Sequence, residues 1–321
     1  MLDLEAWLAE RWYGGVAPGL GLRAVAGVYR LARHIRSVPS PQRVPVPVVV
    51  AGNFTIGGTG KTPLVIAMAL QLAARGRHPG IVSRGHGRRS RAPVRVDLDT
   101  PVEDCGDEPK LIHERTGLPV FVDRDRVAAA CAAVAAGCDV VLADDGLQHR
   151  RLARDIEIEV IDGARGYGNG LLVPAGPLRE APRHCDFRIV NGEPQRKGDW
   201  PMRLRMCEAA PLAGAGARRP LDSFFGTRVN AVCGIGNPAR FFAGLRDAGL
   251  EVDEHPFPDH HGFQALDFAG IRGTVMMTEK DGVKCRSLGL EDAWVVPVEA
   301  EIPAGFHAAL AARLEQVHVR A

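Results

Sequence analysis

The residues of this chain that can do chemistry first gather in a short loop after an apolar segment. Residues 48–51 read Val-Val-Val-Ala, and residues 57–62 read Gly-Gly-Thr-Gly-Lys-Thr. Glycines let backbone N–H groups turn inward around phosphate oxygens, because no Cβ blocks the close approach. Lys61 can then reach the β- and γ-phosphates of a nucleotide, and the hydroxyl of Thr62 can hold Mg²⁺.

This loop predicts a phosphate-binding site with a nucleotide as the first ligand to consider. A helix that starts near Thr62 aims the positive end of its dipole at the same anion. The usual loop pattern has a glycine at the position of Thr55, so the alternative is a glycine-rich hairpin turn beside a surface lysine. The predicted nucleotide-binding residues are Thr55, Ile56, Gly57, Gly58, Thr59, Gly60, Lys61 and Thr62.

Two adjacent acids, Asp144 and Asp145, follow the apolar run at residues 140–143. In nucleotide-binding folds an acid at the end of such a strand holds Mg²⁺ directly or through water. Neighbouring side chains at a strand end point in different directions, so one acid can face the metal while the other accepts hydrogen bonds. The alternative is a solvated turn or a helix N-cap. The phosphate loop upstream favours the metal role.

A further acid, Asp107, lies in the polar turn Gly-Asp-Glu-Pro before a predicted helix. Taken alone, this pattern is typical of a helix-capping carboxylate. Kinase chemistry, however, needs mainly positioning, charge neutralisation and one carboxylate near the acceptor hydroxyl. Together with the phosphate loop, Asp107 is therefore a candidate base.

Two other charged segments give weaker signals. Asp259, His260 and His261 have the wrong spacing for a helical pair of metal-binding histidines, but a carboxylate beside two imidazoles can tune the pKa of another group. Residues 278–281 read Thr-Glu-Lys-Asp, and this order differs from the Asn-Lys-x-Asp of guanine-binding loops. The second segment therefore predicts no base recognition.

Residues 174–180 form a proline-containing loop that ends in Arg179 and Glu180. Arg179 can hold a phosphate, because a guanidinium matches phosphate geometry, and Glu180 can help at a metal. The alternative is a turn that carries a surface ion pair.

Alternating strand and helix patterns must position these groups. Strands that alternate with helices predict an α/β fold, with a P-loop NTPase-like, mostly parallel sheet and helices on both faces. In such sheets ligands lie beyond the carboxyl ends of the strands. The polar clusters fall at such ends: residue 52, residues 83–84, residues 144–145 and residue 162.

The chain divides into three predicted parts. Residues 1–37 form an amphipathic helical segment, residues 38–227 the phosphate-loop domain, and residues 228–321 a smaller C-terminal α/β domain. Residues 209–220 are rich in Ala, Gly, Pro and Arg, so they predict a linker.

Composition excludes several classes of protein. The 321 residues are 46% hydrophobic and carry a net charge of +2, so a large core can form and nucleic acid is not an expected partner. The seven cysteines form no CxxC pair and predict no zinc framework. No apolar run approaches the ~20 residues of a membrane span, and the start lacks a basic signal-peptide region, so a cytoplasmic location is expected.

The N-terminal segment allows two interpretations. Trp7, Trp12 and Tyr13 lie near several arginines, and the pattern after the break at Pro18 and Gly19 is amphipathic. One interpretation is an ordinary helical cap on the core. The other is an interfacial segment on an anionic membrane, with the aromatic rings at headgroup level. The residues alone slightly favour the first.

Taken together, the motifs resemble the tetraacyldisaccharide 4'-kinases, the lipid A 4'-kinases of Gram-negative bacteria. The match runs in order from residue 52 to residue 284 and is specific as a set, although each motif alone is not. The matching segments are residues 52–63, 83–88, 106–109, 144–149, 172–180, 257–261 and 278–284. The family itself carries threonine at the position of Thr55, and it usually has tyrosine where this chain has His86.

The resemblance implies a reaction and a location. The reaction transfers the γ-phosphoryl of ATP, with Mg²⁺, to the 4'-hydroxyl of a tetraacylated glucosamine disaccharide 1-phosphate. A lipid with four acyl chains cannot leave the bilayer cheaply, at ~0.8 kcal/mol per exposed CH₂. The enzyme is therefore expected as a peripheral or monotopic protein on the cytoplasmic face of the inner membrane, docked through residues 1–37.

The resemblance also implies roles for individual residues. Asp107 is the expected base, assisted by His260 or, in the alternative register, His261; Lys61 completes the catalytic set. The implied metal ligands are Thr62, Asp144, Asp145 and Glu180, and the implied substrate contacts are Arg84, Gln148, His149 and Arg179.

The rival functions are another phosphate-loop ATP-dependent enzyme and a nucleotide-switched partner protein.

Overall fold

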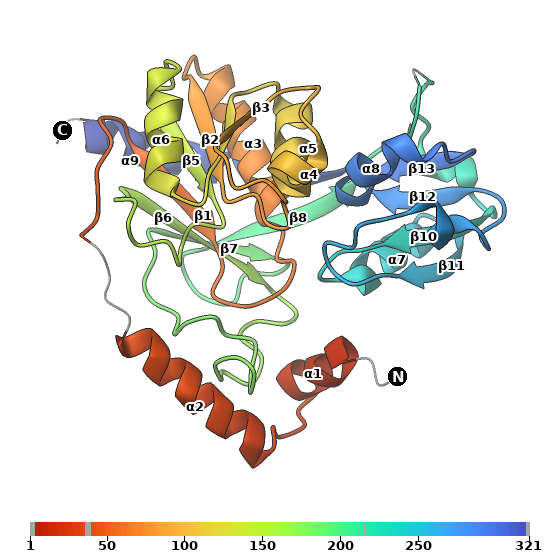
Figure 1. Ribbon diagram of the computed structural model, residues 1–321, viewed down its shortest axis with the longest axis horizontal. Helices are drawn as coiled ribbons and strands as arrows, with labels where there is room; N and C mark the ends of the chain where they lie inside the picture. Colours follow the sequence, from red (N-terminus) through yellow and green to blue (C-terminus); the bar gives the residue numbers. More distant parts are fainter. Residues whose placement is uncertain (1–3, 36–39, 215, 319–321) are drawn as a thin grey trace.

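Two sheets of unequal size organise the protein. The structure is a computed structural model that describes residues 4–35, 40–214 and 216–318 (Figure 1). The larger sheet has the strand order β14-β8-β7-β6-β1-β5-β2-β4-β3. Its strands are β1 (Val48–Gly52), β2 (Pro79–Ser83), β3 (Val94–Val96), β4 (Val120–Val122), β5 (Val140–Asp144), β6 (Ile156–Asp162), β7 (Phe187–Asn191), β8 (Asp199–Met206) and β14 (Val298–Glu301).

The larger sheet is parallel except at its two edges, where β3 and β14 pair antiparallel with their neighbours. Alternate residues of β1 face opposite helical layers, as a buried parallel strand requires. Val49 and Ala51 pack in the core that contains residues of α3 (Lys61–Ala74), α5 (Asp107–Thr116) and α9 (Ala304–His318), whereas Val48 and Val50 pack with α6 (Arg126–Ala135). The expected α/β fold with helices on both faces is confirmed.

The smaller sheet forms a second lobe with the order β11-β10-β12-β13-β9. Its two faces have separate apolar cores, one of which contains Phe241 and Phe242 from α7. The elements of this lobe are β9 (Ala210–Pro211), β10 (Arg228–Cys233), α7 (Pro238–Asp247), β11 (Glu251–Pro256), β12 (Val275–Thr278), α8 (Glu279–Cys285) and β13 (Ala293–Val296); single-turn helices are η1 (Leu221–Phe224), η2 (Ala265–Phe268) and η3 (Arg286–Leu288).

The chain crosses between the lobes twice, and this corrects the predicted boundaries. Strand β8 of the large sheet leads into β9 of the small one, and β13 leads back into β14. Residues 298–318 therefore belong to the large lobe, where Phe306, Leu310 and Leu314 of α9 are buried in its core. The sequence assigned this segment to the smaller domain, because a helix pattern shows that one face is apolar but not which sheet covers it.

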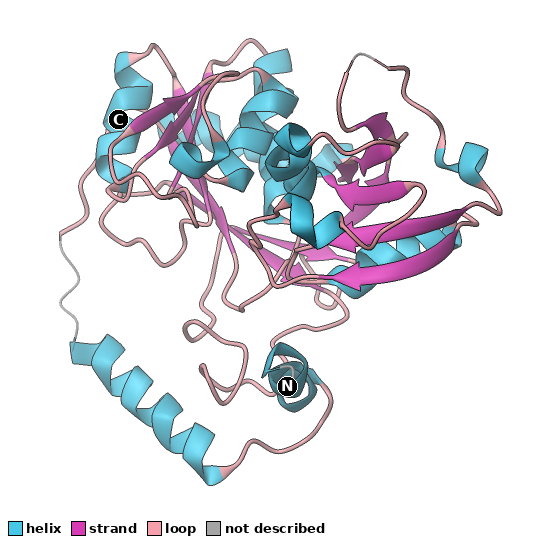
Figure 2. Ribbon diagram, turned by 45° about the vertical axis from the view of Figure 1, so that its right-hand side comes forward, coloured by secondary structure: helices cyan, strands magenta, loops and turns pink. Residues whose placement is uncertain are grey.

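Two N-terminal helices lie beside the large lobe, α1 (Leu4–Tyr13) and α2 (Leu20–Ile35), and α4 (Val102–Cys105) precedes α5. Figures 1 and 2 show α2 standing away from both sheets, with one long side free. Residues 1–3 and 36–37 of the predicted N-terminal segment lie outside the described residues. None of the described helices combines the length and the apolar character needed to cross a bilayer.

Candidate active site

A cleft of about 1000 Å³ separates the lobes at the carboxyl ends of the large sheet's strands. The predicted phosphate loop forms part of its wall, at residues 56–62, together with Asp145 and Arg179. Residues from the small lobe complete the wall, among them His260 and Lys280. The position agrees with the rule that ligands of open α/β sheets bind beyond the strand ends.

The phosphate loop joins β1 to α3, and α3 begins at Lys61. Gly60 precedes this helix with φ 96° and Gly57 has φ 108°, so two positions of the loop use backbone conformations that side chains disfavour. Within the described chain no side chain caps the start of α3, which leaves its first N–H groups available for an anion. The ammonium of Lys61 donates to the Asn53 side chain at 3.2 Å and lies 3.8 Å from Asp145.

A loop of the small lobe covers the phosphate loop. A Cβ on Gly236 would lie 2.8 Å from the backbone nitrogen of Gly58, so only glycine permits this approach. Arg165 of the large lobe donates to the Gly236 carbonyl at 3.3 Å and to the Asn237 side chain at 3.0 Å. The two lobes therefore meet directly over the place predicted for the nucleotide phosphates.

Asp144 is buried at the end of β5, and neither of its carboxylate oxygens has a hydrogen-bond partner among the described residues. Burial raises the pKa of Asp144 to about 7, and the nearby charges of Glu108 and Asp145 add to this rise. A buried carboxylate without a partner is costly unless a cation or proton compensates it. The site therefore fits a bound metal ion.

Asp145 faces the phosphate loop with a φ of 49°. Its carboxylate accepts a hydrogen bond from Arg179 at 2.8 Å. Burial raises the pKa of Asp145, but the charges of Lys61 and Arg179 outweigh burial and bring the pKa to about 2. The two neighbouring acids thus differ in pKa, because their side chains point in different directions from the end of one strand and meet different surroundings.

The described residues contain no group of three His, Cys, Asp or Glu side chains that could hold a metal ion unaided. A cation here would need phosphate or water oxygens as well, which is how proteins usually bind Mg²⁺. Thr62 lines the cleft at the start of α3. Glu180 is different: it accepts hydrogen bonds from Arg33, Gln148 and Arg150, so the structure engages it in ion pairs instead of leaving it free for a metal.

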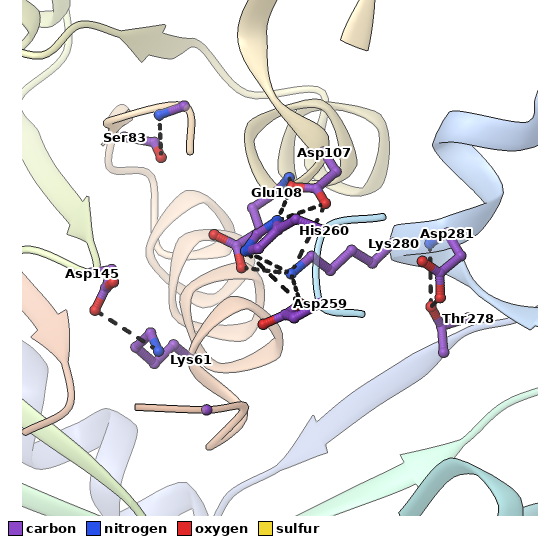
Figure 3. Close-up of polar contacts among 12 residues, drawn as sticks. Lys61, Ser83, Asp107, Glu108, Asp145, Asp259, His260, Thr278, Lys280 and Asp281 are labelled. Carbon is purple, nitrogen blue, oxygen red and sulfur yellow. Dashed lines mark hydrogen bonds and ion pairs between the residues drawn. The ribbon is translucent and has the colours of Figure 1, made fainter. Parts of the chain in front are cut away.

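Asp107 begins α5 and is buried, and Figure 3 shows it apart from Asp145 and Lys61. Its carboxylate lies 3.0 Å from Nδ1 of His260, which comes from the small lobe. His261 instead lies 3.0 Å from Asp267. The structure therefore brings His260, and not the alternative His261, to the candidate base.

Electrostatics keep Asp107 ionised. Burial raises its pKa, but the hydrogen bond from His260 and the charge of Lys280 outweigh burial and bring the pKa to about 2. Burial lowers the pKa of His260, yet the hydrogen bond to Asp107 leaves that pKa above its usual value. In this pair the carboxylate of Asp107 accepts a hydrogen bond from the imidazole of His260, and His260 holds its proton more tightly than a free histidine does.

Several charged residues around Asp107 and His260 were not predicted as site residues from the sequence. Lys280 lies at the centre of these residues, with contacts to Glu108 at 3.2 Å and to Asp259 at 3.3 Å (Figure 3). Lys284 lies 2.8 Å from the fully buried Asp281 and 3.9 Å from Asp107. The signal was present in the segment Thr-Glu-Lys-Asp-Gly-Val-Lys after β12, in which Lys284 stands about one helical turn from Lys280 and Asp281 on α8.

The predicted substrate contacts take different positions. Arg84 is exposed after β2, while Gln148 donates to the Asn53 carbonyl at 2.9 Å and so supports the phosphate loop. Burial lowers the pKa of His149, and the charge of Arg126 adds to this. The ring of His86 lies 4.5 Å from the ring of His260.

Comparison with known proteins agrees with this geometry. The family model "Tetraacyldisaccharide-1-P 4'-kinase" (LpxK) matches residues 20–315. A tetraacyldisaccharide 4'-kinase of Stenotrophomonas maltophilia (strain R551-3) is 49% identical over 326 residues, which cover 95% of this chain and 96% of the relative. The tetraacyldisaccharide 4'-kinase of Xylella fastidiosa (strain M12) is 50% identical over 329 residues, and the alignment covers 97% of each chain.

A solved structure shares the fold. LpxK from Aquifex aeolicus, crystallised in complex with ATP, superimposes with a TM-score of 0.70 and 24% sequence identity. The superposition covers 91% of this chain and 95% of the Aquifex chain. Both lobes are therefore common to the two proteins.

Proposed function

The chain belongs to the tetraacyldisaccharide 4'-kinase family, and from this premise we propose how its residues transfer a phosphoryl group. It is a phosphotransferase of lipid A biosynthesis, a tetraacyldisaccharide 4'-kinase. The γ-phosphoryl of ATP goes to the 4'-hydroxyl of a tetraacylated glucosamine disaccharide 1-phosphate. The observation that carries the residue assignment is the Asp107–His260 pair, which joins the two lobes and whose His260 lines the same cleft as the phosphate loop.

The phosphate loop would hold the triphosphate, with the first N–H groups of α3 and the ammonium of Lys61 on the phosphate oxygens. Thr62, Asp144 and Asp145 would hold Mg²⁺, because Asp144 has buried oxygens without a partner among the described residues, and Thr62 and Asp145 line the cleft. When bound, Mg²⁺ neutralises charge on the β- and γ-phosphates. Glu180 is no longer proposed as a metal ligand, since its oxygens serve Arg33 and Arg150.

On the acceptor side, the carboxylate of Asp107 accepts a hydrogen bond from the sugar 4'-hydroxyl and orients its oxygen toward the γ-phosphorus. As the new O–P bond forms and the bond to ADP breaks, the hydroxyl proton passes to Asp107. His260 holds the carboxylate in place, and Lys280 offsets the acidic charge of Asp107, Glu108 and Asp259.

The test is to incubate the protein with ATP, Mg²⁺ and detergent-dispersed disaccharide. Formation of phosphorylated lipid supports the proposal, whereas ATP hydrolysis at a rate independent of the lipid, with no phosphorylated lipid formed, contradicts it.

The Asp107–His260 pair makes a prediction about pH. The hydrogen bond from His260 is the strongest effect that lowers the pKa of Asp107, so His260→Gln should raise that pKa. Since the reaction needs ionised Asp107, the acidic limb of the kcat/KM profile should move to higher pH. His261→Gln is the matched control and should leave the limb in place, because His261 pairs with Asp267. An acidic limb that stays fixed in His260→Gln would mean that another group sets it.

We also propose that α2 docks the enzyme on the bilayer. Its large apolar side chains are mostly exposed, with Leu20 at 84%, Val28 at 68%, Leu31 at 59% and Ile35 at 71%. Successive members of this set share one side of the helix at 3.6 residues per turn. An exposed apolar helix face of this kind is typical of helices that lie in the membrane interface.

We assign this role to α2 instead of to Trp12, which first suggested it. The indole N–H of Trp12 donates to the Pro174 carbonyl at 2.9 Å, and the backbone carbonyl of Trp12 accepts from Asn169. Trp12 is thus attached to the protein, and α2 supplies the free apolar surface. Shallow insertion of α2 into the cytoplasmic leaflet would place the cleft next to the headgroup of the lipid substrate, whose acyl chains stay in the bilayer.

Docking through α2 predicts weaker membrane binding when its apolar face is made polar. Leu20→Ser with Leu31→Ser should lower binding to phospholipid vesicles by about tenfold or more, since each leucine contributes roughly 1 kcal/mol or more at an interface. Co-sedimentation with vesicles measures this. Leu266→Ser is the control, because Leu266 is 81% exposed but lies in the small lobe. Equal loss in both variants would count against a role specific to α2.

A further inference from the structure

Helix α2 has a second face, opposite the exposed apolar one, and this face reaches the kinase site. Tyr29 and Arg33 lie one helical turn apart on it. The Tyr29 hydroxyl donates to the backbone carbonyl of Arg179 at 3.0 Å. The guanidinium of Arg33 donates to the same carbonyl and, at 2.7 Å, to the carboxylate of Glu180.

The segment that α2 contacts is paired on its other side with the phosphate loop. The Arg179 N–H donates to the Phe54 carbonyl at 2.7 Å, and the Ile56 N–H donates to the Pro177 carbonyl at 2.8 Å. Thr55 and Leu178 are partners in an antiparallel bridge. Residues 177–180 are therefore a layer between α2 and the start of the loop.

Arg179 connects this layer to the acid pair. Its backbone N–H is bonded to Phe54, its backbone carbonyl to α2, and its guanidinium to Asp145 at 2.8 Å. Asp145 in turn lies 3.8 Å from Lys61. A continuous series of polar contacts thus runs from α2 to the lysine of the phosphate loop.

We propose that Arg33 is a positioning residue of the kinase reaction, through which the membrane-docking helix α2 holds Arg179, and with it Asp145, in place behind the phosphate loop. This inference rests on the proposed roles of α2 and of Asp145. Arg33 touches no reacting atom. It acts by satisfying the Arg179 carbonyl and by neutralising Glu180.

The burial of Glu180 explains why a charged residue is needed at position 33. Glu180 is 4% exposed, and its other cationic partner, Arg150, is 47% exposed and lies at 3.3 Å. Without Arg33 the buried carboxylate would lose its shortest ion pair, and a buried charge that loses a partner is strongly destabilised unless another cation compensates it. Arg179 is the adjacent residue in the chain, so Glu180 would compete with Asp145 for it.

The experiment compares Arg33→Gln with Arg30→Gln in the full-length protein. Arg30 is exposed on the same helix and carries the same charge, but no hydrogen bond or ion pair joins Arg30 to residues 177–180 in the described chain. With ATP, Mg²⁺ and detergent-dispersed disaccharide, Arg33→Gln should lower kcat by about tenfold while KM for the lipid stays within about twofold. Arg30→Gln should keep kcat within about twofold of the parent. Arg33→Lys should restore part of the loss, since an ammonium can pair with Glu180 but does not reproduce the forked contact with Arg179.

The outcomes separate this inference from the docking role. Rates are expressed per folded molecule, so that reduced stability is not counted as lost kcat. Equal kcat in the two glutamine variants, or a loss in Arg33→Gln that vanishes after this correction, would overturn the inference. Vesicles of phosphatidylethanolamine and phosphatidylglycerol test docking separately. Normal vesicle binding by the Leu20/Leu31 serine variant would overturn docking, whereas the kcat difference in detergent would still decide the role of Arg33.

Discussion

Asp107→Asn is expected to lower kcat by about 10²–10⁴-fold, the range typical for loss of a general base. The amide keeps the shape of the side chain and can still meet His260, but it cannot accept the hydroxyl proton. ATP binding should be nearly unchanged, because the hydrogen bonds and ion pairs of Asp107 in the described chain go to Glu108, His260, Lys280 and Lys284 and not to the phosphate loop. The measurement pairs steady-state kinetics on detergent-dispersed disaccharide with an ATP-binding isotherm.

The chain supplies a close control for this variant. Asp267 also accepts a contact from a histidine, His261, at 3.0 Å, and it belongs to the same small-lobe region as His260. Asp267→Asn should therefore change kcat far less than Asp107→Asn. If ATP affinity fell together with kcat in Asp107→Asn, Asp107 would be a nucleotide ligand and the assignment of the base would be wrong.

Asp144→Asn should have the second-largest effect, with opposite signs on activity and stability. Loss of a metal ligand is expected to lower kcat by about 10²–10³-fold and to raise the Mg²⁺ concentration needed for half-maximal rate. Without Mg²⁺ the same variant should be more stable, by roughly 1 kcal/mol or more, because it removes a buried carboxylate that no described residue pairs. Kinetics over a Mg²⁺ series and urea unfolding of the metal-free protein measure the two effects.

Asp162→Asn provides the contrast. Asp162 is also buried at the end of a central strand, but it accepts from the backbone of Ala164 and pairs with Arg240 at 2.7 Å. Its replacement should lower the free energy of unfolding and leave the Mg²⁺ requirement unchanged. A metal-free Asp144→Asn protein that is less stable than its parent would show that Asp144 has a structural role instead.

Much of the large lobe could be predicted because its signals are local. The apolar strand, the glycines and Lys61 of the phosphate loop are neighbours in the chain, and so are the residues of β5 and the acid pair. The place of helix α9 (Ala304–His318) in the large lobe was not predicted, since that depends on which sheet the chain returns to.

The local amino-acid sequence thus determined the phosphate loop, the acids at strand ends and the alternation of strands with helices. Hydrophobic periodicity and backbone preferences depend on residues that are close together in the chain, so a short segment carries these signals. Tertiary structure alone decided which histidine meets Asp107, since His260 and Asp107 stand 153 positions apart. It also turned Glu180 toward Arg33 instead of a metal and left one face of α2 free. Such choices depend on how distant segments pack and pair their charges, and no short stretch of sequence carries that information.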